Sequence, residues 1–257
     1  ASDEDDLLGA LTLMVCVLHP KQNDIEAGSL VSENGLALAK RRAAKKGIIK
    51  GDDLARGFAW LRPNDLIWNY VINNYLLGQD PPAFDVLFWN ADATNLSASL
   101  MGDFLTIFET LAFTKKGQVE MVDHKIDLSK VTSDLFILGG VTDHITPWKA
   151  TYRSTRLFGS KDVTYVLSHS GHMQAILNPP GNPKAKYYVH KDGNDTLPKT
   201  ADEWLKGAEE VAGSWWPYWM GWLQARAGEK KKAPAKLGNK NYTPLDPAPG
   251  LYVMEPC

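Results

Sequence analysis

Two residues of this sequence, Asp143 and His172, have the types and spacing of an acid–base pair. Asp143 follows the apolar run 135–141, and His172 comes shortly after the apolar run 163–167. Both runs are short and continuous, which predicts buried strands, and residues 148–158 predict a helix between them. A strand, a helix and a strand of these lengths form a parallel crossover, and ligands bind beyond the C-terminal ends of such strands. We therefore expect the two side chains to lie close together at the C-terminal edge of one parallel sheet.

An adjacent carboxylate and imidazole assist proton transfer from a weak nucleophile. The imidazole takes the proton of a thiol or hydroxyl, and the carboxylate fixes the imidazole tautomer and stabilises its charged form. An acid followed along the chain by a His is the later part of the order nucleophile, acid, His that is typical of the α/β-hydrolase fold. We expect Gly171 to let the backbone turn so that the ring of His172 points over the strand ends. The alternative interpretation is that Asp143 is only a helix N-cap and His172 only a loop residue.

The nucleophile of such a site has no evident place in this sequence. No Gly-x-Ser-x-Gly or Gly-x-Cys-x-Gly segment occurs. Cys16 lies inside the predicted strand 11–18, between Val15 and Val17, where a buried, small apolar side chain is the expected role. Because the nucleophile precedes the acid in this fold, we expect it upstream of Ala1. The chain would then be an N-terminally truncated piece, inactive by itself, since the groups of such a site act as a unit.

The remaining segments predict the elements that hold this site in place. Four Trp, at positions 215, 216, 219 and 222, fall in a predicted helical region over 200–227 and should pack against another element. In the aromatic segment 52–78, Pro63 is expected to break one helix, and Asn64 or Asp65 to cap the next. The pattern also predicts a basic helix over 35–46, a helix over 99–113, a strand over 119–125 and a flexible Lys-rich tail over 229–240.

The composition is that of an ordinary globular protein. Of 257 residues, 44% are hydrophobic and 23% charged, and the net charge of -2 gives no indication of a nucleic-acid surface. No apolar run approaches the ~18 residues of a membrane span. The two cysteines, Cys16 and Cys257, form no disulfide framework and indicate a reducing cytoplasm, and no spacing of Cys and His resembles a zinc site.

Six segments resemble the bacterial polyhydroxyalkanoate synthases, over nearly the whole chain. They are 58–70 (FAWLRPNDLIWNY), 88–96 (FWNADATNL), 140–148 (GVTDHITPW), 170–180 (SGHMQAILNPP), 213–217 (GSWWP) and 248–253 (APGLYV). The resemblance implies an α/β-hydrolase core, with a mostly parallel sheet, and an inserted helical cap subdomain. The implied boundaries are 1–18 for a core strand, 19–92 for the cap, 93–227 for the core with Asp143 and His172, and 228–257 for a tail. Ser97 stands where the family has Pro, which affects a turn.

The same resemblance implies an activity. The protein would be an acyltransferase that polymerises 3-hydroxyacyl-coenzyme A into polyester and releases coenzyme A through a Cys-Asp-His site. His172 would activate the Cys, and Asp143 would help to activate the 3-hydroxyl of the acyl chain through the His. No cofactor and no metal are expected, because the coenzyme A thioester is the substrate. The implied partners are this thioester, the growing polyester chain, the surface of a cytoplasmic polyester granule and a second copy of the chain in a homodimer.

Two other functions are compatible with parts of the pattern. An α/β-hydrolase esterase or polyester depolymerase would share Asp143 and His172 but would use a Ser nucleophile. A non-catalytic protein attached to granules would account for the Trp-rich region and the Lys-rich tail. The retention of both Asp143 and His172 argues against this last function.

Overall fold

The computed structural model describes residues 8–21, 41, 43–61, 63–81, 93–190, 197–248, 250–251 and 254–255. By its internal contacts the chain divides into two compact units. The first comprises Ala1–Ser32 and Leu105–Gly228, and the second comprises Glu33–Phe104 and Glu229–Cys257. The domain boundaries implied by the resemblance stay a prediction.

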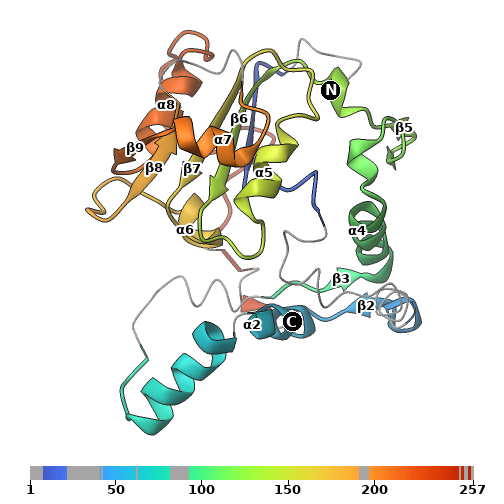
Figure 1. Ribbon diagram of the computed structural model, residues 1–257, viewed down its shortest axis with the longest axis vertical. Coiled ribbons are helices and arrows are strands. Elements are labelled where there is room, and N and C mark those ends of the chain that lie inside the picture. The colour runs from blue at the N-terminus through green and yellow to red at the C-terminus, as the bar shows by residue number, and fades with distance from the viewer. Residues whose placement is uncertain are drawn as a thin grey trace. The chain divides into compact units, whose positions relative to one another are not determined.

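The first unit is built on a five-stranded sheet with the order β1-β6-β7-β8-β9. Three neighbouring strands, β1 (Ala10–Met14), β6 (Asp134–Gly140) and β7 (Val163–Ser168), are parallel. Two further strands, β8 (Lys186–Val189) and β9 (Glu209–Ala212), continue the sheet in antiparallel pairing. Figure 1 shows α5 (Trp148–Ser154) crossing between β6 and β7, so the predicted crossover is confirmed.

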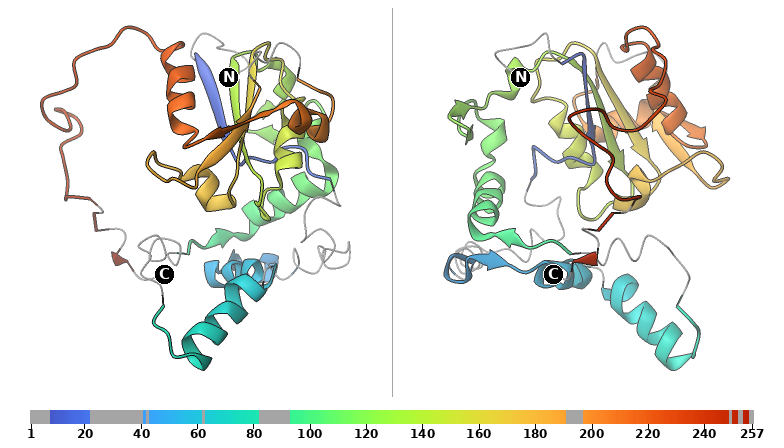
Figure 2. Two further views of the ribbon diagram at one scale, coloured as in Figure 1. Left: turned by 60° about the vertical axis from the view of Figure 1, so that its left-hand side comes forward. Right: turned by 180° about the vertical axis from the view of Figure 1, so that it is seen from behind.

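Each face of this sheet is covered by helices, and alternate residues of the strands face each side. Leu135 and Ile137 of β6 pack with Tyr152 of α5 and Trp204 of α7 (Ala201–Gly207). Phe136 and its neighbours on the opposite face pack with the Trp-rich helix α8 (Trp216–Gln224). Figure 2 shows α8 against one face of the sheet. The prediction that the four Trp pack against another element is confirmed: Trp215 is fully buried and the others contact the same core.

Several elements differ from the sequence predictions. The region 200–227 is not one helical stretch, because β9 separates α7 from α8. The strand expected over 119–125 is a tight hairpin of β4 (Glu120–Met121) and β5 (His124–Lys125), with φ values of 49° and 64° at Val122 and Asp123. Two left-handed residues reverse the chain direction there, as a two-residue hairpin turn requires. The helix predicted over 99–113 is α4 (Ala98–Thr110), followed by the 3-10 turn η5 (Ala112–Thr114).

In the second unit, β2 (Ile48–Ile49) pairs with β3 (Leu96–Ser97), and α2 (Gly51–Leu61) is followed by η3 (Asn64–Trp68) and η4 (Val71–Leu76). The expected capping by Asn64 or Asp65 is wrong: the N-cap residue of η3 is Pro63, which is in helical conformation and makes no side-chain capping hydrogen bond. Pro fits this position because a helix start needs no backbone N–H donor. The basic helix predicted over 35–46 lies largely outside the described residues, although 41 and 43–46 are helical.

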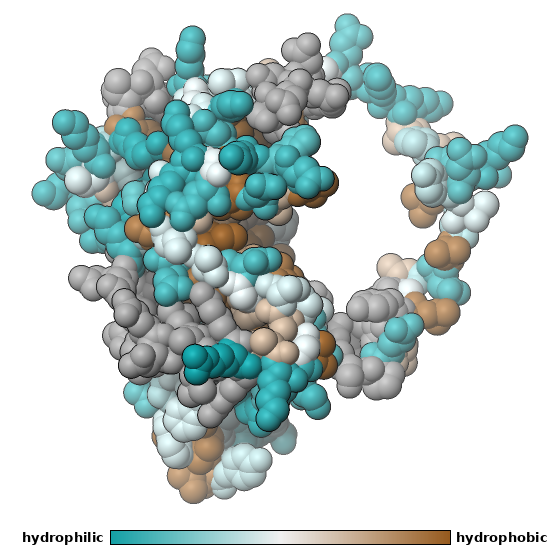
Figure 3. All heavy atoms as spheres, turned by 90° about the vertical axis from the view of Figure 1, so that its right-hand side faces the viewer, coloured by the Kyte–Doolittle hydropathy of each residue, from teal (hydrophilic) through white to brown (hydrophobic). Residues whose placement is uncertain are grey.

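Within the described ranges, no helix is both long and apolar enough to cross a membrane. Among the residues coloured in Figure 3, hydrophilic ones predominate on the face shown and hydrophobic ones form small separate patches. Between 229 and 248 the described residues form no helix or strand.

Candidate active site

Asp143 lies three residues beyond the end of β6, in the loop that leads to α5, and its side chain is fully buried. Its Oδ1 accepts the backbone N–H groups of Ile145 (2.9 Å) and Thr146 (2.8 Å), and its Oδ2 accepts the hydroxyl of Thr146 (2.7 Å). The alternative role as a helix N-cap is wrong, because α5 begins at Trp148 with Pro147 as its N-cap. The carboxylate instead closes its own loop and is held in one orientation.

The environment of Asp143 keeps it ionised. Burial by itself disfavours the charged carboxylate and raises the pKa, but the hydrogen bonds outweigh it. The ring of His172 donates one of these bonds, and the backbone and hydroxyl of Thr146 donate the others. The net result is a pKa of Asp143 below its usual value of 3.8. A charged acceptor is therefore present beside the imidazole throughout the neutral pH range.

His172 is the first residue of the short helix α6 (His172–Ile176), not a loop residue, and its side chain is 26% exposed. Its Nδ1 lies 2.8 Å from Oδ2 of Asp143, so the predicted proximity of the two side chains is confirmed. The same nitrogen lies 3.1 Å from Oγ1 of Thr146. That hydroxyl already donates its hydrogen to the carboxylate, so Nδ1 must carry the proton and donate it. The basic lone pair of the neutral ring is then on Nε2.

The two loops that carry Asp143 and His172 approach closely at Gly140, the last residue of β6. A Cβ atom on Gly140 would lie 2.7 Å from the carbonyl oxygen of Ser170 and 3.0 Å from Cβ of Ala175. By contrast, the expectation that Gly171 is needed for the turn into His172 is wrong. Gly171 has φ of -79°, which any residue adopts, and a Cβ there would meet nothing closer than 3.6 Å. Gly140, which the sequence analysis did not single out, is the position that requires glycine. The neighbouring pair Gly139-Gly140 at a strand end was the available signal.

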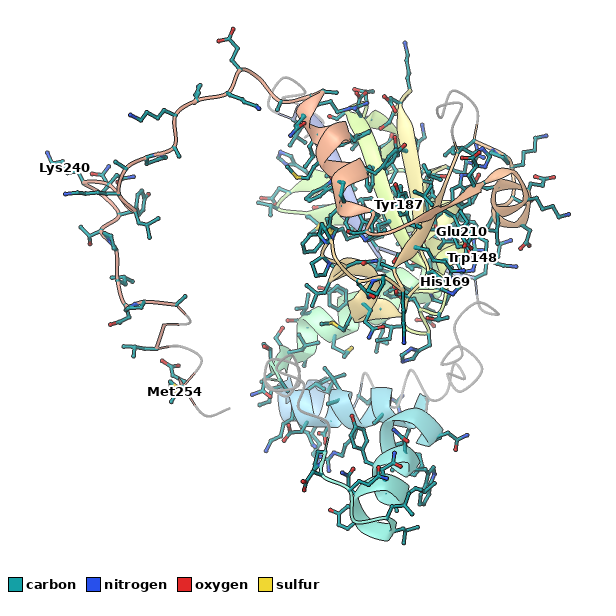
Figure 4. The ribbon with its side chains drawn as sticks, turned by 90° about the vertical axis from the view of Figure 1, so that its left-hand side faces the viewer. Trp148, His169, Tyr187, Glu210, Lys240 and Met254 are labelled. Atoms are coloured by element: carbon teal, nitrogen blue, oxygen red, sulfur yellow. The ribbon has the colours of Figure 1, made fainter. Side chains whose placement is uncertain are left out.

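Figure 4 labels Trp148 and His169, which mark these two loops: Trp148 begins α5 after Asp143, and His169 follows β7 before His172. His169 packs against Tyr188 with ring centroids 6.2 Å apart. Tyr188 in turn donates a hydrogen bond to Glu210 of β9, which also accepts one from Lys186 of β8.

Cys16 does not lie in the middle of a strand as expected. Strand β1 ends at Met14, and Val15 has φ of 46°, which turns the chain out of the sheet. Cys16 thus follows the C-terminal end of the strand that pairs with β6. Partial burial raises the pKa of its thiol, which disfavours the reactive thiolate. No hydrogen bond joins Cys16 to Asp143 or His172 in the part of the chain that the structure describes.

The described segments contain no group of three or more His, Cys, Asp and Glu residues arranged to hold a metal ion. The arrangement at hand is an ionised carboxylate hydrogen-bonded to Nδ1 of an imidazole whose Nε2 has no hydrogen-bond partner among the described residues, at the C-terminal edge of parallel strands. Such an arrangement accepts a proton from a nucleophile and returns it to a leaving group.

Comparison with known proteins finds relatives that match most of the chain. The chain is 46% identical over 251 residues to poly(3-hydroxyalkanoate) polymerase 1 of Ectopseudomonas oleovorans, which covers 98% of this chain and 44% of that protein. It is 48% identical over 243 residues to polymerase 2 of the same organism, covering 95% and 42%. It is 42% identical over 207 residues to the poly(3-hydroxyalkanoate) polymerase subunit PhaC of Cupriavidus necator, covering 80% and 34%.

The chain thus spans less than half the length of the curated relatives that it matches. The resemblance inferred from the six sequence segments is confirmed by these relatives. A family model described as the alpha/beta hydrolase fold matches residues 5–179. With its parallel strands, its crossover helix and its Asp and His beyond consecutive strand ends, the chain belongs to the alpha/beta hydrolase fold family.

Proposed function

We propose that this chain supplies the acid and base of an acyltransferase that polymerises 3-hydroxyacyl-coenzyme A into polyester and releases coenzyme A. The observation that carries the proposal is the 2.8 Å contact between Nδ1 of His172 and the buried carboxylate of Asp143. It occurs in a chain 46% identical to a protein named as a poly(3-hydroxyalkanoate) polymerase. The likeness supports the substrate class, and the contact supports the roles of the two residues.

In the first chemical step, His172 acts as the base for a cysteine nucleophile. Its Nε2 takes the thiol proton, and the thiolate attacks the thioester carbonyl. The bond from the acyl carbon to the sulfur of coenzyme A breaks, and the imidazolium returns the proton to the departing thiolate. Because one thioester replaces another, this loading step needs no cofactor.

In the second step, the 3-hydroxyl of one acyl unit attacks the acyl thioester of another. The hydroxyl proton passes to Nε2 of His172, an ester bond forms, and the cysteine thiolate is released and protonated again. A secondary alcohol is a much weaker acid than a thiol, so this step depends more strongly on Asp143. The carboxylate stabilises the imidazolium that forms when the ring takes the alcohol proton.

The proposal extends to where the reaction occurs. The growing polyester collects in a granule, and the protein acts at the granule surface in the cytoplasm as a homodimer. The motif resemblance of residues 58–70, 88–96 and 170–180 supports these partners. Binding of the purified chain to polyester particles and its mass in solution test them separately.

A chimera tests the proposed chemistry. This chain replaces the matched region of the Ectopseudomonas oleovorans polymerase 1, and coenzyme A release is followed with 3-hydroxyacyl-coenzyme A thioesters of several acyl lengths. We expect the chimera to polymerise. We expect His172→Ala to abolish the first, stoichiometric release, and Asp143→Asn to retain that release but to lose steady turnover. His169→Ala, three residues from His172 and outside the pair, is the matched control.

Three outcomes would contradict the proposal. A folded but inactive chimera would show that the chain does not supply the acid and base. Full activity of the His172→Ala chimera would exclude His172 as the base. Release of free 3-hydroxy acids without polymer would favour the esterase function over the acyltransferase.

A further inference from the structure

Helix α6, which presents His172, is too short to hold itself in place. It has five residues, His172–Ile176, and an isolated helix of this length is unstable in water. Within it, the N–H of Ala175 bonds to the carbonyl of Gly171 at 2.7 Å. At its end, the carbonyl of Met173 accepts the N–H of Leu177 at 2.8 Å and that of Ile176 accepts the N–H of Asn178 at 3.1 Å, and any further hydrogen bonds there need donors from elsewhere in the fold. The direction of the His172 ring therefore depends on contacts made by other parts of the fold.

Two neighbouring tryptophans provide these donors. The indole Nε1–H of Trp215 donates to the carbonyl of Ala175 at 2.8 Å, and that of Trp216 donates to the carbonyl of Ile176 at 3.0 Å. Ile176 lies one helical turn from His172, about 6 Å along the axis. Both donors reach α6 across 40 residues of sequence. The end of α6 opposite His172 is thus fixed by two hydrogen bonds to the segment 215–216.

The segment that bears the two indoles is itself firmly attached to the sheet. Gly213 donates its N–H to the carbonyl of Ala185 at 2.7 Å, and its φ of 99° makes the turn between β9 and α8. Ser214 donates its hydroxyl to the carbonyl of Asn178, just beyond α6, and accepts the backbone N–H of Trp216 at 3.0 Å. Because these hydrogen bonds hold residues 213–216 in place, the indoles can determine the position of α6.

We propose that the indole N–H groups of Trp215 and Trp216 are positioning groups for His172. They hold α6 so that the ring keeps its contact with Asp143. The inference rests on the proposed function in treating His172 as the base, but the positioning itself is a property of the fold. The indole N–H groups donate to backbone carbonyls of α6, so their effect on the imidazole passes through the backbone of the helix.

The same aromatic cluster contains internal controls. All four Trp pack on the same core, but their N–H groups differ. The indole of Trp219 donates to the hydroxyl of Thr12 in β1 at 3.1 Å, away from α6. The buried Nε1 of Trp222 has no hydrogen-bond partner among the described residues. Phe at position 216 therefore removes a hydrogen bond to α6, and Phe at position 219 removes a hydrogen bond to β1. Phe at position 222 removes no hydrogen bond to a described residue, although the ring lies in the same cluster.

The test measures how well the Nδ1 proton of His172 is protected from water. A proton held between an imidazole and a buried carboxylate gives a separate downfield NMR signal, here assigned by its loss in His172→Gln. In the 257-residue chain, we expect Trp216→Phe to speed exchange of this proton about fivefold, the effect of one lost hydrogen bond on an opening equilibrium. Trp219→Phe and Trp222→Phe should leave the exchange rate within about twofold of the unsubstituted chain.

Equal acceleration in Trp216→Phe and Trp219→Phe would overturn the proposal, because the effect would then follow general stability. An unchanged rate in Trp216→Phe would overturn it as well. If Trp216→Phe fails to fold, replacement of Trp216 by 3-benzothienylalanine keeps the bicyclic ring, removes only the donor, and is judged by the same two criteria. Because no turnover is needed, this result is independent of the chimera experiment. In an active chimera, Trp216→Phe should lower kcat and leave KM unchanged.

Discussion

Because the loops that carry Asp143 and His172 approach closely at Gly140, the effect of Gly140→Ala on stability can be predicted in magnitude. The added Cβ would lie 2.7 Å from the carbonyl oxygen of Ser170, 3.0 Å from Cβ of Ala175 and 3.3 Å from Cβ of Asp143. All three atoms belong to the loops or the helix of the candidate site, and none is the end of a flexible side chain. Overpacking at such a position costs about 1–3 kcal/mol. We expect this loss in the free energy of unfolding, together with a longer separation between Asp143 and His172.

Gly171→Ala is the matched control, in the same loop pair. Its Cβ would meet only Thr142, at 3.6 Å or more, in ordinary van der Waals contact. The entropy gain of a Gly-to-Ala change, about 0.4–1 kcal/mol, is offset by a loss of similar size at an N-cap position. We expect a change within about 0.5 kcal/mol. Urea unfolding measures both variants, and the Nδ1–H exchange of His172 reports the separation. If Gly140→Ala is as stable as Gly171→Ala, the argument from close approach is refuted.

Three further predictions concern the carboxylate and one helix cap. Because folding lowers the pKa of Asp143 below 3.8, its ionised form stabilises the fold above that pH, and this contribution is lost as the pH falls through the lowered value. In Asp143→Asn, the free energy of unfolding should therefore fall less steeply as the pH is lowered. If urea unfolding gives the same fall at acidic pH (the acid limb) as in the unsubstituted chain, this prediction is wrong. Thr146→Val removes the 2.7 Å hydroxyl donor to the carboxylate, so the acid limb should move to higher pH and stability at neutral pH should fall by about 1.5–3 kcal/mol. Thr200→Ala removes a capping box shared with Glu203 at the start of α7 and should cost about 1 kcal/mol in thermal unfolding, with no effect on the His172 signal.

The parallel strands were predictable because their signal is local. Strands β6 and β7 are buried on both faces, so most residues in them are apolar and the runs stand out in the sequence. The positions of Asp143 and His172 followed directly, since consecutive parallel strands end at the same edge of a sheet. The edge strand β9, with alternately half-buried and exposed residues, carries no such run and was read as helix. The end of β1 before Cys16 was missed for a related reason: the apolar pattern continues through Val17 although the backbone turns at Val15.

The sequence by itself determined the fold class, the strands that end at the site, the family resemblance, and the choice of Asp143 and His172. These features depend on residue type and on spacing along one or two neighbouring elements. Only the tertiary structure decided the Nδ1–H tautomer of His172, the need for glycine at position 140 instead of 171, and the bonds from Trp215 and Trp216 to α6. Each depends on atoms that meet across many residues of chain, at distances where a few tenths of an ångström decide between a contact and a clash. Periodicity specifies which face of an element is buried, but not which atoms it will meet there.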